Sequence, residues 1–240
     1  MSTPLASDVA MILAAGLGTR MRPLTLDRPK PLVEVAGKAM IDHCLDKLAE
    51  AGIARAVVNV HYLPDQLIAH LQRRTVPKVA VSDERELLLE TGGGMIRALP
   101  LIDADPFFAL NSDNLWLDGP QDVFHQLSAV WDPQAMDALL LVVPHARAGN
   151  FKGKGDFHMD GLGRLTLRRS GRIAPFIYTG IQLVSQRLLR DAPAGPFGTM
   201  QLWRRAMAEK RLFGVSHLGH WFEVGSPAAI QPTEAALANA

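Results

Sequence analysis

Apolar runs alternate with segments of helical periodicity along the first two-thirds of the chain. Four largely apolar segments predict buried strands, at residues 9–13, 56–60, 107–110 and 138–143. Apolar positions at helical spacing predict intervening helices, at residues 39–51 and from Pro64 through Leu71. Strands that are apolar at every position are typical of sheets covered by helices on both faces. The alternation therefore predicts an α/β fold around a largely parallel sheet.

The pattern changes after Pro144. Residues 156–160 and 164–168 alternate in polarity about two glycines, which predicts a small antiparallel hairpin. Further elements are predicted beyond it: helices at residues 185–190, 200–210 and 228–239, and a short strand at residues 221–224. Because no repeat or low-complexity linker interrupts these elements, we expect one domain spanning residues 1–240.

Length, net charge and cysteine content limit the classes of protein to which the chain can belong. The chain has 240 residues, of which 48% are hydrophobic, and a net charge of +1. A chain of this length can bury a large core, and its near-zero charge creates no general attraction for nucleic acid or anionic membranes. Its one cysteine, Cys44, and the lack of a leader-like or membrane-spanning segment are typical of a cytoplasmic protein. We therefore expect neither nucleic acid nor membrane as a partner.

A glycine-rich turn follows the first predicted strand. It contains Gly16 and Gly18, followed by Thr19 and Arg20. Glycines let backbone N–H groups approach an anion closely, so this turn suits the phosphates of a nucleotide. Met21 stands where a dinucleotide fingerprint has its third glycine, and no Gly-Lys pair is followed by serine or threonine. These features exclude two other phosphate-binding motifs, the dinucleotide fingerprint of hydride-transfer enzymes and the P-loop.

The residues of this region, taken in order, resemble the signature of the sugar-1-phosphate nucleotidyltransferases. The matching segments are residues 13–21 (LAAGLGTRM), 23–25 (PLT) and 29–32 (PKPL), and the resemblance extends to about Gly225. It implies a Rossmann-like, glycosyltransferase-A-like fold with three α/β/α layers. It also implies two small-molecule partners, a nucleoside triphosphate bound by residues 1–145 and a sugar 1-phosphate bound by residues 146–240. Monomer and homodimer remain open.

The predicted catalytic set consists of Arg20 and Lys30, which belong to the signature, and Asp113, which lies further along the chain. The planar guanidinium of Arg20 suits the β- and γ-phosphates, and Lys30 suits the α-phosphate, although each could be an ordinary surface charge. Asp113 follows a predicted strand, where it can bind a metal or cap a turn. The resemblance implies Mg²⁺ as the cofactor, with Asp113 and Glu223 as its ligands, although the family usually has aspartate at the second position.

Two segments supply the predicted nucleotide-binding residues, which are Leu13, Ala14, Ala15, Gly16, Gly18, Thr19, Glu90, Thr91, Gly92 and Gly93. The second segment is expected to be a loop before a helix at residues 95–99, and the resemblance places it against the nucleobase. A generic glycine loop is the alternative. Residues near the hairpin supply the predicted sugar-phosphate site, namely Lys152, Lys154, Asp156, Thr179 and Gly180. Solvated hairpin charge is the alternative for the two lysines.

Within the family, the short chain most resembles the members that transfer a uridylyl group from UTP to N-acetylmuramate 1-phosphate in peptidoglycan recycling. Residues 90–94, 153–157 and 219–225 carry this likeness, whereas Leu88 and Glu223 replace the proline and aspartate usual in that group. The implied reaction is in-line attack of the sugar phosphate on the α-phosphorus, with release of pyrophosphate. Three alternatives remain: a guanylyltransferase acting on mannose 1-phosphate, a nucleotidyltransferase acting on another phosphorylated compound, and a non-catalytic nucleotide-sugar sensor.

Overall fold

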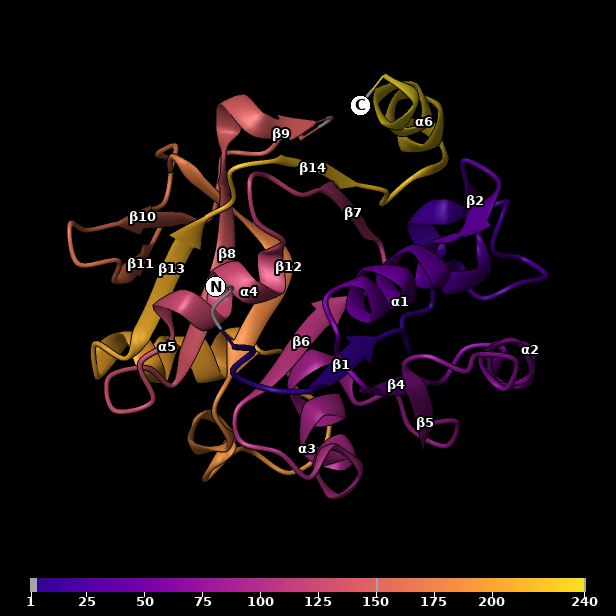
Figure 1. Ribbon diagram of the computed structural model, residues 1–240, viewed down its shortest axis with the longest axis horizontal. Helices are drawn as coiled ribbons and strands as arrows, with labels where there is room; N and C mark the ends of the chain where they lie inside the picture. The colour runs from indigo at the N-terminus through magenta and orange to yellow at the C-terminus, as the bar shows by residue number, and fades with distance from the viewer. Residues whose placement is uncertain (1–3, 150, 240) are drawn as a thin grey trace.

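A nine-stranded sheet forms the centre of the computed structural model, which describes residues 4–149 and 151–239 (Figure 1). The path runs in the order β11-β10-β12-β6-β1-β4-β5, and β8 pairs with β12 and with β13. The bounds of its strands are β1 Val9–Leu13, β4 Arg55–Val60, β5 Lys78–Asp83, β6 Phe107–Asn111, β8 Ala138–Pro144, β10 Phe157–Met159, β11 Leu165–Leu167, β12 Phe176–Val184 and β13 Leu212–Ser216. The sheet thus extends from the β10–β11 hairpin to β5 and its neighbour α2.

The sheet is mixed but mostly parallel, as predicted. β1 pairs in parallel with both β4 and β6, β4 with β5, and β13 with β8. β12 is antiparallel to β6, β8 and β10, and β11 is antiparallel to β10. All strands except β11 and β12 therefore run in one direction. Because ligands in such sheets bind beyond the carboxyl ends of the strands, this arrangement locates the expected site.

Helices cover both faces of the sheet, which gives the three layers that the sequence predicted. Alternate residues of β1 point to opposite faces, so Ala10 and Ile12 join one core and Val9 and Met11 the other. The first core contains α1, α2 and α4, and the second contains α3 and α5. Their bounds are α1 Met40–Glu50, α2 Pro64–Leu71, α3 Glu90–Ile102, α4 Val123–Val130 and α5 Met200–Ala208.

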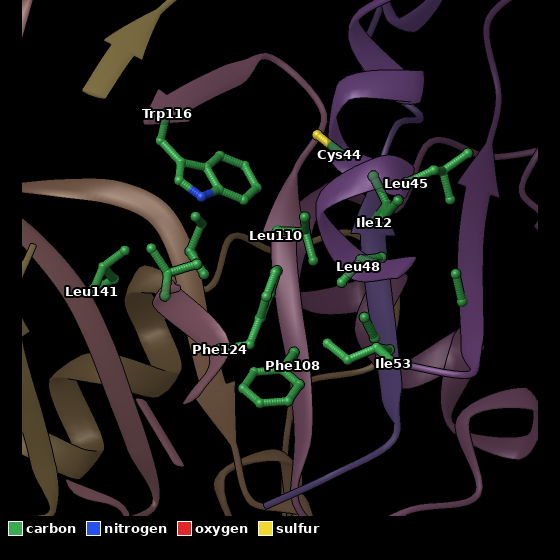
Figure 2. Packing of buried hydrophobic residues seen from close by; sticks show 14 of the residues in the cluster. Ile12, Cys44, Leu45, Leu48, Ile53, Phe108, Leu110, Trp116, Phe124 and Leu141 are labelled. Atoms are coloured by element: carbon green, nitrogen blue, oxygen red, sulfur yellow. The ribbon is translucent and has the colours of Figure 1, made fainter. Parts of the chain in front are cut away.

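Figure 2 shows how α1 packs on the first face, with Leu45 and Leu48 beside Ile12 of β1. Phe124 of α4 meets Phe108 of β6 edge to face, with their ring centroids 5.2 Å apart. Cys44 is completely buried in the same layer, and its burial raises the pKa of the thiol to about 12. The thiol is thus a packing group of the core.

A smaller sheet and the last helix lie beyond the end of β6 (Figure 1). The three strands lie in the order β7-β14-β9, and a separate two-stranded ribbon joins β2 and β3 (Figure 1). The bounds are β2 Glu34–Val35, β3 Lys38–Ala39, β7 Asn114–Leu117, β9 Ala148–Gly149, β14 His220–Glu223 and α6 Ile230–Ala238. Short 3-10 turns complete the fold, at Thr19–Met21, Lys30–Leu32, His145–Arg147, Gln186–Leu189 and Pro227–Ala229.

Several predicted elements differ from the observed ones. Residues 185–190 form a short 3-10 turn instead of an α-helix. The predicted hairpin is present as β10 and β11, and the pairing of β10 with β12 joins it to the main sheet. Thr179 and Gly180 lie within the long strand β12. This strand was not predicted, and neither were β5, β7 and β13.

Candidate active site

A cleft with a volume of about 460 Å³ opens where β1 and β6 end. Its walls are formed by Leu13, Ala14, Ala15, Gly16, Gly18, Thr19, Arg20, Met21, Lys30, Pro31, Asn59, Leu88, Glu90, Thr91, Asn111, Ser112, Asp113 and Gly225. This set contains the whole predicted catalytic set and eight of the ten predicted nucleotide-binding residues. The structure therefore brings together residues that are far apart in the sequence, at positions 13–31, 59, 88–91, 111–113 and 225.

The glycine-rich turn is shaped by Gly18, whose φ of +64° is the left-handed conformation that favours glycine. A Cβ at Gly18 would lie 3.0 Å from Cβ of Lys30 and 3.1 Å from Cγ2 of Thr25. Thr25 also donates a hydrogen bond of 2.8 Å from its hydroxyl to the carbonyl of Gly18. Gly18 thus lets the two halves of the signature pack together and places Lys30 at the cleft.

Two ion pairs lie at the charged end of the cleft. Nζ of Lys30 is 2.5 Å from Oδ2 of Asp113, and both side chains are largely buried. A second, looser pair joins NH1 of Arg20 to Oε1 of Glu223 at 3.4 Å, with the arginine side chain 68% exposed. Lys30 is therefore held in place before any ligand arrives, whereas Arg20 is free to move.

The two predicted metal ligands lie on adjacent backbone segments. β14 pairs with β7, and the N–H of Val224 donates to the carbonyl of Asp113 at 3.0 Å. Within residues 4–149 and 151–239, no group of three or more metal-binding side chains is present. Two carboxylates are hard oxygen ligands, and Mg²⁺ commonly completes its coordination with water and substrate phosphates. The chemistry of the two side chains is compatible with a divalent metal ion, and their assignment as its ligands stays a prediction.

The glycines at positions 92–94 belong to a helix and not to the loop that was predicted. α3 begins at Glu90, so Gly92, Gly93 and Gly94 lie in its first two turns. The N–H groups of Gly92 and Gly93 both donate to the carbonyl of Phe197, at 2.8 and 3.2 Å. Their amides are thus occupied within the protein, and Gly92 and Gly93 do not line the cleft. Glu90 and Thr91 do line it.

Sequence analysis missed a buried polar bridge between the two walls. The N–H of Ala14 donates to Oδ1 of Asn59 at 2.7 Å, and Nδ2 of Asn59 donates to Oε1 of Glu84 at 2.9 Å. Oε2 of Glu84 accepts from the N–H of Leu89 at 3.3 Å. Burial raises the pKa of the Glu84 carboxyl. An asparagine inside the apolar run Val57–Val60 was the available sequence signal, because a buried amide requires partners.

The predicted sugar-phosphate residues lie outside the lining of this cleft. The carboxylate of Asp156 accepts the N–H of Tyr178 at 2.9 Å, and the buried hydroxyl of Thr179 donates to the carbonyl of Leu141 at 2.8 Å. Both groups therefore serve the packing of β12. Lys152 and Lys154 are exposed on the loop before β10.

Gly180 has a different role, since it makes room for a side chain of the cleft. Its φ is +84°, and a Cβ there would lie 2.0 Å from Nδ2 of Asn114 and 3.0 Å from Nδ2 of Asn111. Asn111 lines the cleft at the end of β6. Gly180 thus does not line the cleft, but its lack of a side chain leaves room for Asn111 and Asn114.

The three-layer fold and a cleft that combines a glycine-rich turn with two carboxylates, a lysine and an arginine define a class of α/β enzymes that handle nucleotide phosphates. Residues 9–151 match the family model for nucleotidyl transferases. The chain belongs to this family and is a nucleotidyltransferase of sugar-nucleotide synthesis. The resemblance given by its signature is confirmed. In the described part of the chain, none of the helices has the length and apolar character needed to cross a membrane.

Two similar proteins and one solved structure illustrate the relationship. The N-acetylmuramate alpha-1-phosphate uridylyltransferase of Caulobacter vibrioides is 44% identical over 239 residues, covering 98% of this chain and 99% of that protein. The protein of the same name from Neisseria meningitidis is 34% identical, with coverages of 94% and 96%. A UDP-glucose pyrophosphorylase complexed with UDP-glucose shares the fold, with a TM-score of 0.76 at 14% identity over 98% of this chain and 100% of that chain.

Proposed function

We propose that this enzyme transfers the uridylyl group of UTP to N-acetylmuramate 1-phosphate, forming UDP-N-acetylmuramate and pyrophosphate. The observation that carries the proposal is the 44% identity, over almost the full length of both chains, to a protein named for that reaction. The composition of the cleft supports it, because cations and carboxylates gather where β1 and β6 end. The product is an activated cell-wall sugar, so we also propose a cytoplasmic role in peptidoglycan recycling.

The charged end of the cleft suits the triphosphate. Lys30 is preorganised, so its ammonium group is placed to neutralise charge on the α-phosphate as the attacking oxygen approaches. The exposed guanidinium of Arg20 can turn from Glu223 toward the β- and γ-phosphates and orient them as the leaving group. Asp113 and Glu223 would hold Mg²⁺, which supplies further charge neutralisation on the phosphates when it is bound.

The nucleophile requires no general base. A sugar 1-phosphate already carries an ionised oxygen at neutral pH, so the protein has to align it with the α-phosphorus and the departing pyrophosphate. The P–O bond to the sugar phosphate forms while the bond to the β-phosphate oxygen breaks, and the released electron pair stays on pyrophosphate. No covalent enzyme intermediate is needed. Binding of the sugar by the segment of Lys152, Lys154, Asp156, Thr179 and Gly180 remains a prediction.

The test is a pyrophosphate-release assay with purified enzyme and Mg²⁺. UTP, GTP, CTP, ATP and dTTP are each combined with the 1-phosphates of N-acetylmuramate, N-acetylglucosamine, glucose and mannose. We expect turnover with UTP and N-acetylmuramate 1-phosphate to exceed every other pair, and Asp113→Asn to abolish most of it. Preferred use of GTP with mannose 1-phosphate would replace the proposed substrates, and nucleotide binding without any turnover would favour a sensor.

A further inference from the structure

A short segment from the C-terminal half is docked on the start of α3. It comprises residues 195–199, immediately before α5. The carbonyl of Phe197 accepts the N–H groups of Gly92 and Gly93, and its own N–H donates to the carbonyl of Leu89 at 3.2 Å. The Phe197 ring is only 3% exposed. The segment therefore satisfies helix N–H groups that would otherwise lack an intrahelical partner.

The glycines of α3 make this docking possible. A Cβ on Gly92 would lie 2.2 Å from Cε2 of Phe197, and a Cβ on Gly93 would lie 2.6 Å from the carbonyl oxygen of Gly195. Any larger residue at either position would push the segment away. The glycine run that the sequence analysis assigned to close approach of a base thus serves close approach of another part of the same chain.

The segment also holds the hydroxyl of Thr91, which is exposed on the cleft wall. Oγ1 of Thr91 accepts the N–H of Thr199 at 2.9 Å and lies 2.7 Å from Oγ1 of Thr199. Thr199 is buried, so its hydroxyl proton needs an acceptor inside the protein, and Thr91 provides that acceptor. With both lone pairs of its oxygen engaged, Thr91 can act only as a donor toward the cleft.

The position of Thr91 in the cleft indicates what it donates to. The cations Arg20 and Lys30 lie by the glycine-rich turn and attract the triphosphate, whereas Thr91 stands beside Leu88 and the carboxylate of Glu90. A wall with a carboxylate and without a cation repels phosphates and leaves that side of the cleft to the nucleobase. On the nucleobase, the groups that accept a hydroxyl proton include the carbonyl oxygens of uracil.

The family resemblance already places Thr91 against the nucleobase. We propose that Thr199 is a positioning residue, which orients the Thr91 hydroxyl so that it donates a hydrogen bond to a carbonyl oxygen of the bound nucleobase. The inference deepens the proposed function and rests on a nucleotide occupying this cleft. Thr199 acts from the half of the chain that was expected to bind the sugar. A residue outside the cleft therefore sets the affinity for the nucleotide.

The test compares Thr199→Val, Thr199→Ser and Thr91→Val by steady-state kinetics. Thr199→Val removes the hydroxyl at nearly constant volume, and it should raise KM for UTP about fivefold, as expected for one neutral hydrogen bond. The KM for the sugar 1-phosphate and kcat should stay within about twofold of wild type. Thr199→Ser should restore the wild-type KM for UTP. The double variant should be no worse than Thr91→Val, because both changes remove one shared contact.

Ser128→Ala is the matched control, since this hydroxyl in α4 also accepts a backbone N–H, from Ala6, away from the cleft. It should leave both KM values unchanged. An unaltered KM for UTP in Thr199→Val, or additive effects in the double variant, would overturn the inference while leaving the proposed function intact. If the wild type shows no turnover with UTP, calorimetric Kd values for UTP replace KM. Equal Kd values in wild type and Thr199→Val, or no binding of UTP, would then overturn it.

Discussion

Replacing Gly92 by alanine tests whether the contact between α3 and the segment of Phe197 organises the cleft. The added Cβ would lie 2.2, 2.6 and 2.9 Å from three ring atoms of Phe197. Ordinary carbon contacts lie near 3.5–4.0 Å, so the ring has to move by roughly 1 Å or more. Because the ring is buried and its carbonyl bonds Gly92 and Gly93, the displacement also strains the backbone contacts of the segment.

The expected loss of stability follows from opposing contributions. Alanine gains about 1 kcal/mol over glycine within a helix. Overpacking a filled site costs about 1–3 kcal/mol. Weakening three hydrogen bonds between Phe197 and α3 adds about 0.5–1.5 kcal/mol for each bond that is lost. We therefore expect the free energy of unfolding to fall by about 2 kcal/mol, which for a chain of this length lowers Tm by roughly 4–8 °C.

The measurement is thermal unfolding followed by circular dichroism, supported by urea titration. Gly161→Ala is the control, because a Cβ at Gly161 meets no atom within 4 Å and this glycine has no positive φ. It should leave Tm within about 1 °C of wild type, as is usual for surface substitutions. A Gly92→Ala variant as stable as wild type, with an unchanged KM for UTP, would refute the reasoning, because the helix would then tolerate a side chain where Phe197 packs.

Three further predictions concern catalysis, stability and pH. Asp113→Asn should lower kcat on the order of a hundredfold and change Tm by only a few degrees; near-normal turnover at saturating Mg²⁺ would remove Asp113 from the proposed site. Asp137→Ala should lower the free energy of unfolding by about 2 kcal/mol in urea titrations, because this buried carboxylate accepts hydrogen bonds from Arg187 and Arg211, each at 2.6 Å. Burial lowers the pKa of His217 in the folded protein, because the charged imidazolium loses contact with water. The stability contributed by the neutral imidazole is therefore present above the pKa of the unfolded chain and is lost as the pH falls through the pKa of the folded state. The Tm of wild type should therefore fall more between pH 7.5 and pH 5 than that of His217→Gln, and equal slopes would contradict this assignment.

Continuous apolar runs made the central strands predictable, and the less apolar strands were missed for identifiable reasons. β1 and β8 are buried along almost their whole length, so their sequences are apolar throughout. β12 contains buried Thr179 and Gln182, whose polar groups bond to Leu141 and to Trp203. Such partners come from distant segments, so a sequence cannot reveal that these residues tolerate burial. The mostly half-buried edge strand β5 likewise lacks a long apolar run.

The signature made Arg20 and Lys30 predictable, because they are close together in the chain. Their partners Asp113 and Glu223 are distant in the sequence and were predicted as metal ligands only from the family resemblance. The wall formed by the start of α3 was harder to predict from the sequence. A run of glycines indicates a position where bulk is excluded, but it does not say which group comes close. Here the neighbour of Gly92 and Gly93 is the segment of Phe197, which only the folded structure brings there. The bridge from Asn59 to Glu84 escaped prediction for the same reason.

The pairing of β14 with β7 has a consequence for biosynthesis. The ribosome makes the glycine-rich turn, Lys30 and Asp113 early, but Glu223 reaches Arg20 only when β14 has emerged and paired with β7. In the proposed mechanism, a nascent chain that ends at β13 lacks one of the two carboxylates that would hold the metal ion. We therefore expect catalysis to begin only after the C-terminal region has left the ribosome and folded.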